Sequence, residues 1–165
     1  MASPKQHSPR VPTPGRRDRK AQDALWLAKL REDGVANHIP TPPEPPTELV
    51  KGIEEFNQTL FFECHETLEN LWRVTPYPLR LFYQGLIKAA VGFLHITRHN
   101  RRGAVGLLSG ALVALEPFPP QFMGVDNQEL KRSVSVWLEA VSAGTTWDEL
   151  LSSPFPKMVF HSSEE

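Results

Sequence analysis

Apolar residues recur at intervals of three and four through the first long segment after residue 46. Between Glu48 and Arg73 the apolar positions are Ile53, Phe56, Leu60, Cys64, Leu68 and Leu71. This spacing matches the 3.6-residue period of an α-helix with one buried face. Thr47 is a favourable N-cap residue. We therefore predict one long helix over 48–73, starting after Thr47.

Two further helices follow it. The apolar positions Phe82, Leu86, Ala90, Phe93 and Leu94 predict a helix over about 79–99, and the preceding Pro78 suits a first turn. Asn100 is a good N-cap for a third helix over about 101–116. Its small residues are Gly103, Ala104, Gly106, Gly110 and Ala111. They predict that neighbouring helices approach this one closely.

The remaining helix signals are capping boxes. Asp126 with Glu129 predicts a helix over about 127–143, and Thr146 with Glu149 predicts a short one before Pro154. No run of residues alternates with period two, so no strand is predicted. Short connections between four main helices predict an all-α fold, a compact antiparallel bundle with short flanking helices.

The N-terminal part of the chain has a different composition. It holds many of the 16 prolines, with a dense group between Pro40 and Pro46 that cannot be helical. A short helix is predicted over 18–33, with residues 1–17 disordered. We therefore divide the chain into a Pro-rich arm over 1–46, a helical domain over 47–151 and a C-terminal tail over 152–165.

Charge and cysteine content limit the possible partners. A formal net charge of −1 gives no overall field that would attract nucleic acid or an anionic membrane. The apolar stretch over 103–115 is too short to span a bilayer, and the N-terminus shows no signal peptide. The single cysteine, Cys64, fits a reducing compartment. We therefore expect a cytoplasmic protein that binds neither nucleic acid nor membrane.

Polar residues gather on one side of the predicted helix over 48–73. At about 100° per residue, His65 and Glu69 lie one turn apart on the same side, with Trp72 close by and Glu66 to one side. The next helix carries a polar stripe of Gln84, Lys88, His95 and His99. If the two faces meet, these side chains converge.

Three interpretations of this cluster remain open. His65 and Glu69 can form an exposed pair that contributes a few tenths of a kcal/mol. The cluster can instead be a buried structural network, with Glu66 or Glu69 paired to Lys88. It can also be a ligand or metal site, in which His65, Glu69 and His95 hold the metal ion. His-Glu-x-x-Glu is not the His-Glu-x-x-His motif of zinc proteases.

Several separated segments, in order and spacing, resemble one known family. They are Phe56-Asn57, Phe62 to Trp72, Phe82 to Ile87, Ala90-Val91, His95, Asn100, Gly103-Ala104, Leu107-Leu108 and Gly124 to Asp126. The resemblance is to the uncharacterised proteins grouped as domain of unknown function 309, and it covers roughly 50–141. It implies a compact helical bundle without an established activity. Its signature positions here are His65, Glu66, Glu69, Trp72, Gln84, His95, Asn100 and Gly103.

The sequence thus predicts an uncharacterised helical-bundle protein that acts as a binding or interaction module through a polar cluster between helices. The alternative is a metal-dependent hydrolase in which Glu66 activates a metal-bound water. The cofactor, the identity of a small-molecule or protein partner and the oligomeric state are left open.

Overall fold

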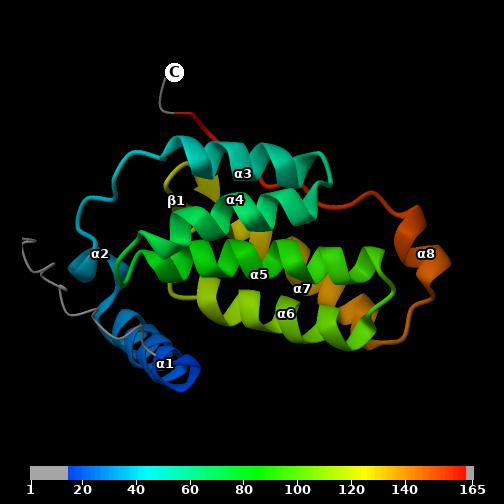
Figure 1. The fold of residues 1–165 in the computed structure, drawn as a ribbon, viewed down its shortest axis with the longest axis horizontal. Helices are drawn as coiled ribbons and strands as arrows, with labels where there is room; N and C mark the ends of the chain where they lie inside the picture. Colours follow the sequence, from blue (N-terminus) through cyan, green and yellow to red (C-terminus); the bar gives the residue numbers. More distant parts are fainter. Residues whose placement is uncertain (1–14, 163–165) are drawn as a thin grey trace, which may run out of the picture.

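Helices make up most of the regular structure in residues 15–162, the part of the chain that this computed structural model describes. Within these residues lie α1 (Arg16–Asp33), α2 (Val35–His38), α3 (Thr47–Asn57), α4 (Phe61–Arg73), α5 (Arg80–Thr97), α6 (Arg101–Leu115), α7 (Asn127–Ser142) and α8 (Trp147–Ser152) (Figure 1). The all-α prediction is confirmed. The disorder expected for the start of the arm, residues 1–14, lies outside the described residues.

The prediction of one long helix over 48–73 is wrong in one respect, because the structure divides this segment into α3 and α4. The break lies at Thr59, whose φ of 62° is in the left-handed region. There the Leu60 N–H turns back to the Glu55 carbonyl at 2.9 Å. The two helices then pack as a hairpin (Figure 1). Helix α3 is capped by Pro46, with Thr47 as its first residue rather than its N-cap.

The other predicted N-caps are confirmed. The Asn100 side chain accepts a hydrogen bond from the Gly103 N–H at 3.0 Å, and α6 begins after it. Asp126 and Thr146 cap α7 and α8 in the same way. These signals are local in sequence, which is why spacing alone identifies them.

Helix α5 is the centre of the bundle and packs against both α4 and α6. Glycines on α5 make the second contact close: a Cβ at Gly85 would lie 2.6 Å from Leu115, and one at Gly92 would lie 2.6 Å from Leu108. The small residues predicted to thin α6 serve this contact only in part, because Gly106 has no neighbour within 4 Å of a Cβ built there.

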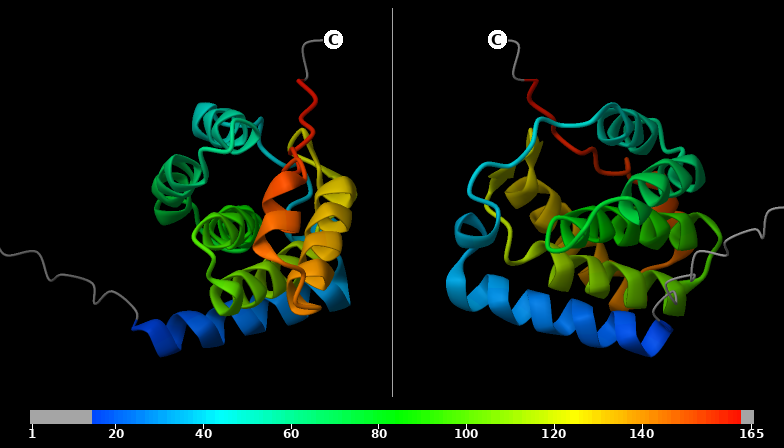
Figure 2. Two further views of the ribbon diagram at one scale, coloured as in Figure 1. Left: turned by 90° about the vertical axis from the view of Figure 1, so that its right-hand side faces the viewer. Right: turned by 60° about the vertical axis from the view of Figure 1, so that its left-hand side comes forward.

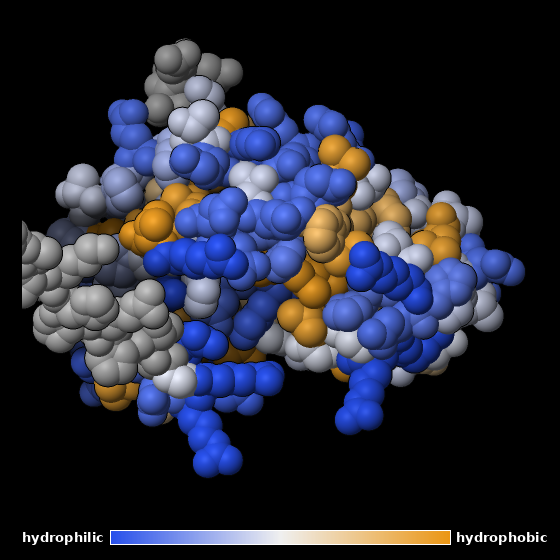
Figure 3. All heavy atoms as spheres, in the orientation of Figure 1, coloured by the Kyte–Doolittle hydropathy of each residue, from blue (hydrophilic) through white to orange (hydrophobic). Residues whose placement is uncertain are grey.

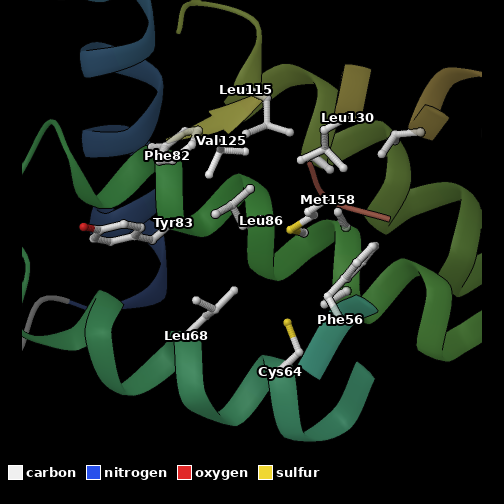
Figure 4. Close-up of a cluster of buried hydrophobic side chains, with 14 of the residues drawn as sticks. Phe56, Cys64, Leu68, Phe82, Tyr83, Leu86, Leu115, Val125, Leu130 and Met158 are labelled. Carbon is white, nitrogen blue, oxygen red and sulfur yellow. The ribbon is translucent and has the colours of Figure 1, made fainter. Parts of the chain in front are cut away.

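Side chains from most of the helices meet in one hydrophobic core (Figure 4). The C-terminal segment contributes Met158. Its backbone N–H donates to Asn57 Oδ1 at 2.7 Å, and Asn57 Nδ2 donates to the Met158 carbonyl at 3.0 Å. A small hairpin, β1 (Gln121–Phe122) and β2 (Val125–Asp126), lies beside it. The prediction that the chain contains no strand missed this hairpin, whose turn places Gly124 at a φ of 80°.

Helix α1 lies across one end of the bundle, where α4 ends, α5 begins and α6 ends (Figure 2). Its Leu27 and Leu30 belong to the buried core, whereas Leu25 is 53% exposed. Arg31 forms an ion pair with Glu116, just after α6, at 3.2 Å. Helix α1 is thus packed onto the bundle by apolar and polar contacts.

Candidate functional site

The predicted site residues lie in three separate places. His65, Glu66 and Glu69 are on the outer side of α4, and His95 and Asn100 are at the junction of α5 and α6. Trp72 and Gln84 are at the end of the bundle that α1 covers. The sequence analysis expected all these residues to converge in one cluster if the two helix faces met. They do not form one cluster.

The first place is a shallow depression on α4 of about 220 Å³. It is lined by Phe62, His65, Glu66, Glu69, Asn70 and Arg73. His65 Nε2 lies 2.8 Å from Glu69 Oε2, and Arg73 donates to the other oxygen of Glu69 at 3.0 Å. The His65 and Glu69 side chains are each about 30% exposed. The surrounding surface of α3 and α4 is mostly hydrophilic (Figure 3).

The environment of the His65 ring constrains its chemistry. Nε2 is held by Glu69, and Nδ1 is buried with no hydrogen-bond partner among the described residues. Neither nitrogen is therefore open to a substrate at this surface. The pair is well suited to fix the ring in one orientation.

The proposed metal ligands do not come together. No group of three or more His, Cys, Asp and Glu side chains within residues 15–162 is arranged to hold a metal ion. His95 Nδ1 instead accepts from the Asn100 amide at 3.1 Å, beyond the end of α5. The set His65, Glu69 and His95 is thus not formed in this structure.

The second place, around His95 and Asn100, has a structural role. Asn100 caps α6 through the Gly103 N–H, and its amide also contacts the His95 ring. A Cβ at Gly103 would lie 2.7 Å from the Asn100 amide nitrogen and 2.9 Å from the His95 ring. These three residues therefore close the turn between α5 and α6.

The third place holds a chain of hydrogen bonds that links three helices. The Trp72 indole N–H donates to Gln84 Oε1 at 3.3 Å, and Gln84 Nε2 donates to Asp23 Oδ2 on α1 at 2.9 Å. The Tyr77 hydroxyl donates to the other oxygen of Asp23 at 2.5 Å. One carboxylate of α1 thus joins the end of α4, the loop after it and α5.

Aromatic and cationic groups surround this hydrogen-bonded chain. The Tyr77 ring stacks on Trp26 of α1, with centroids 6.3 Å apart. The Arg80 guanidinium lies over Trp72 at 4.1 Å and over Tyr77 at 5.0 Å. Burial, followed by the hydrogen bond to Asp23, raises the pKa of Tyr77 to about 12. Tyr77 therefore stays protonated, and a donor, at neutral pH.

Lys88 lies one turn beyond Gln84 and faces Gly110 of α6, where a built Cβ would be 3.4 Å from Nζ. Burial lowers the pKa of Lys88, Lys20 lowers it further and Asp23 opposes the shift. The pairing of Lys88 with Glu66 or Glu69 that the sequence suggested is not formed within residues 15–162, where Lys88 packs against Gly110 of α6. We refer to Trp72, Tyr77, Arg80, Gln84 and Lys88 as the docking surface.

Part of the chain matches a known family. Residues 49–107 match the family described as Domain of unknown function (DUF309). We refer to residues 49–107 as the DUF309 segment. The match confirms the resemblance seen in the sequence. All five residues of the docking surface lie inside the DUF309 segment, and α1 lies outside it.

One curated relative is an uncharacterised protein, YpuF, from Bacillus subtilis (strain 168). It is 34% identical to this chain over 105 residues, and the match covers 59% of this chain and 60% of the relative. Neither its name nor that of DUF309 assigns an activity.

Sequence reasoning missed three residues of this third place, namely Asp23, Tyr77 and Arg80. A signal for the first was present, because the less exposed positions of α1, Arg19, Asp23, Trp26, Leu27 and Leu30, recur at helical spacing. Arg80 stands four residues before Gln84 and Lys88 four residues after it, on one face of α5. No local pattern indicated that these two faces meet over the DUF309 segment.

Proposed function

We propose that this chain is a helix-binding interaction module. Its binding site is the docking surface on the DUF309 segment, and α1 is the bound helix in this structure. One observation carries the proposal. Two hydrogen-bond donors inside the DUF309 segment, Tyr77 and Gln84, find their acceptor in the Asp23 carboxylate, which belongs to a helix outside that segment. Helices that bind through an apolar stripe and one polar anchor are a recurring mode of recognition.

The contacts of α1 have the character of an interface between two partners. Leu27 and Leu30 supply the apolar part, and the stacking of Trp26 on Tyr77 supplies a large aromatic contact. Aromatic residues with such contacts often provide much of the binding energy of an interface. Arg31 and Glu116 add a peripheral ion pair.

The proposal keeps residues 47–151 as the binding domain and residues 1–46 as the arm that carries its occupant. It places the protein in the cytoplasm, supported by Cys64 as a free, buried thiol. No helix within residues 15–162 has both the length and the apolar character needed to cross a bilayer. Among the described residues, the ion pairs of His65 and Glu69 are with each other and with Arg73, and none is with α1, so we assign His65, Glu66 and Glu69 no part in binding the helix.

The test uses a fluorescent peptide with the sequence of residues 15–38. In the wild-type chain α1 is tethered to its site, at an effective concentration on the order of millimolar, so the peptide should bind poorly. The variant Leu27→Ala/Leu30→Ala weakens α1 and should bind the peptide with a Kd of roughly micromolar order. Fluorescence anisotropy measures both.

Two controls make this test specific. Leu25→Ala removes an exposed leucine from the same helix and should behave like wild type. A peptide carrying Leu27→Ala and Leu30→Ala should not bind any variant. The proposal is wrong if proteolysis shows that α1 has detached in the double variant and the wild-type peptide still fails to bind.

A further inference from the structure

The orientation of the Gln84 amide is determined by its neighbour. An indole N–H can only donate a hydrogen bond, so Trp72 must be matched by the oxygen of Gln84. The NH₂ group of Gln84 then points to Asp23, at 2.9 Å from Oδ2. Whatever lies at this position on the bound helix must accept a hydrogen bond.

Tyr77 imposes the same requirement from the other side. Its hydroxyl donates to Asp23 Oδ1, and this donor remains protonated at neutral pH. Two donors, from the loop before α5 and from α5 itself, therefore converge on the two oxygens of one carboxylate. This arrangement matches the shape and charge of a carboxylate group.

Positive charge around this carboxylate exceeds what Asp23 neutralises. In the described part of the chain, Arg19, Lys20, Arg80 and Lys88 have no carboxylate within ion-pair distance. Arg80 Nε is buried without a hydrogen-bond partner, and Lys88 is half-buried between α5 and α6. Unpaired cations in a partly desolvated place favour the binding of an anion.

We propose that Tyr77 and Gln84 form a receptor for one anionic group, which the carboxylate of Asp23 fills from within the chain, with Lys88 as an unpaired cation nearby. For the nature of the partner this rests on the proposed function. A helix that replaces α1 carries an aspartate, a glutamate or a phosphorylated side chain at this position. Four and seven residues later it carries large apolar side chains, as Leu27 and Leu30 do here.

The test fills the emptied receptor with a free anion. The full-length variant Asp23→Ala lacks the carboxylate and keeps the donors, and its Tm is measured in acetate, in inorganic phosphate and in chloride at matched ionic strength. Acetate or phosphate should raise the Tm of Asp23→Ala by about 2–4 °C above its value in chloride. The anion with the larger effect identifies the receptor as one for carboxylate or for phosphate.

Two further variants show whether this shift comes from the receptor. Asp33→Ala removes another carboxylate of α1, one that contacts His38, and should show no specific shift. The double variant Asp23→Ala/Tyr77→Phe lacks one donor and should lose most of the rescue. If Asp23→Ala does not fold, Asp23→Ser replaces it in the same design.

The receptor is refuted if acetate and phosphate act like chloride on the Asp23 variant, or if they act equally on wild type and Asp33→Ala. It is also refuted if the rescue survives Tyr77→Phe. These experiments involve no peptide, so the anion receptor and the binding of a helix from outside can fail independently of each other.

Discussion

His65 and Glu69 illustrate, at the scale of single residues, how burial decides what a polar pair contributes. Their side chains are each about 30% exposed, and Glu69 also binds Arg73 one turn further along α4. Pairs with this i,i+4 geometry at a protein surface contribute a few tenths of a kcal/mol. Of the three interpretations that the sequence left open, we retain the surface pair as a prediction.

Glu69→Ala is expected to lower the free energy of unfolding by less than about 1 kcal/mol, because it removes two partly exposed pairs. Urea unfolding at neutral pH in the presence of a chelator measures this change. A loss above about 2 kcal/mol would show instead that the pair is part of a buried network.

Gly103 and Gly106 form a matched pair of positions on α6. Gly103→Ala places a methyl group 2.7 Å from the Asn100 amide nitrogen and 2.9 Å from the His95 ring, so it should cost about 1–3 kcal/mol. Gly106→Ala has no neighbour within 4 Å and should stabilise the helix by about 0.5–1 kcal/mol. Equal effects in urea unfolding would contradict the packing described at the α5–α6 junction.

At the scale of helices and strands, the elements that could be predicted are those with local signals. Asn100, Asp126 and Thr146 cap helices because each needs only a backbone N–H three residues away. The break at Thr59 could not be predicted in this way. Threonine has no preference for a positive φ, so its conformation reflects packing rather than local sequence.

The contacts of the candidate site also divide into local ones, which could be predicted, and long-range ones, which could not. The contact of His65 with Glu69 lies within one helix and was predictable from spacing. The contact of Gln84 with Asp23 joins residues 61 positions apart, on faces whose meeting depends on the whole packing arrangement. Sequence reasoning therefore identified Trp72 and Gln84 but assigned them to a cluster with the wrong helix.

Removal of residues 1–46 should leave a bundle that unfolds cooperatively, because the helices from α3 to α7 share the core. The Tm should fall, by less than about 10 °C, because the deletion uncovers the surface that Leu27 and Leu30 cover. Thermal unfolding followed by circular dichroism measures the change. Loss of the cooperative transition would show that α1 is an integral part of the domain.

At the scale of the whole molecule, three buried or bonded groups should make stability depend on alkaline pH. Burial raises the pKa of Cys64 to about 12 from 9.0, and those of Tyr77 and Tyr83 to about 12 from 10.0. Above about pH 9 the unfolded chain therefore loses protons that the folded chain keeps, and stability falls as pH rises. Lys88, with its lowered pKa, acts in the opposite direction.

Urea unfolding between pH 8 and pH 11 should thus show a decline in the free energy of unfolding that begins near the ordinary pKa of cysteine, 9.0. Cys64→Ala should delay that decline until tyrosine begins to ionise in the unfolded chain. If stability is constant or rises over this range in the wild type, these groups do not keep their protons in the folded protein.

Docking of α1 as a bound helix on a separately stable bundle is the central claim, and amide hydrogen exchange of the full-length chain tests it most directly. Such an arrangement allows α1 to open while α4 and α5 stay folded. We predict that the amides of α1 exchange with a clearly lower opening free energy than those of α5, and that Asp23→Ala lowers the value for α1 alone. Equal opening free energies in α1 and α5, both lowered together by Asp23→Ala, would contradict the claim.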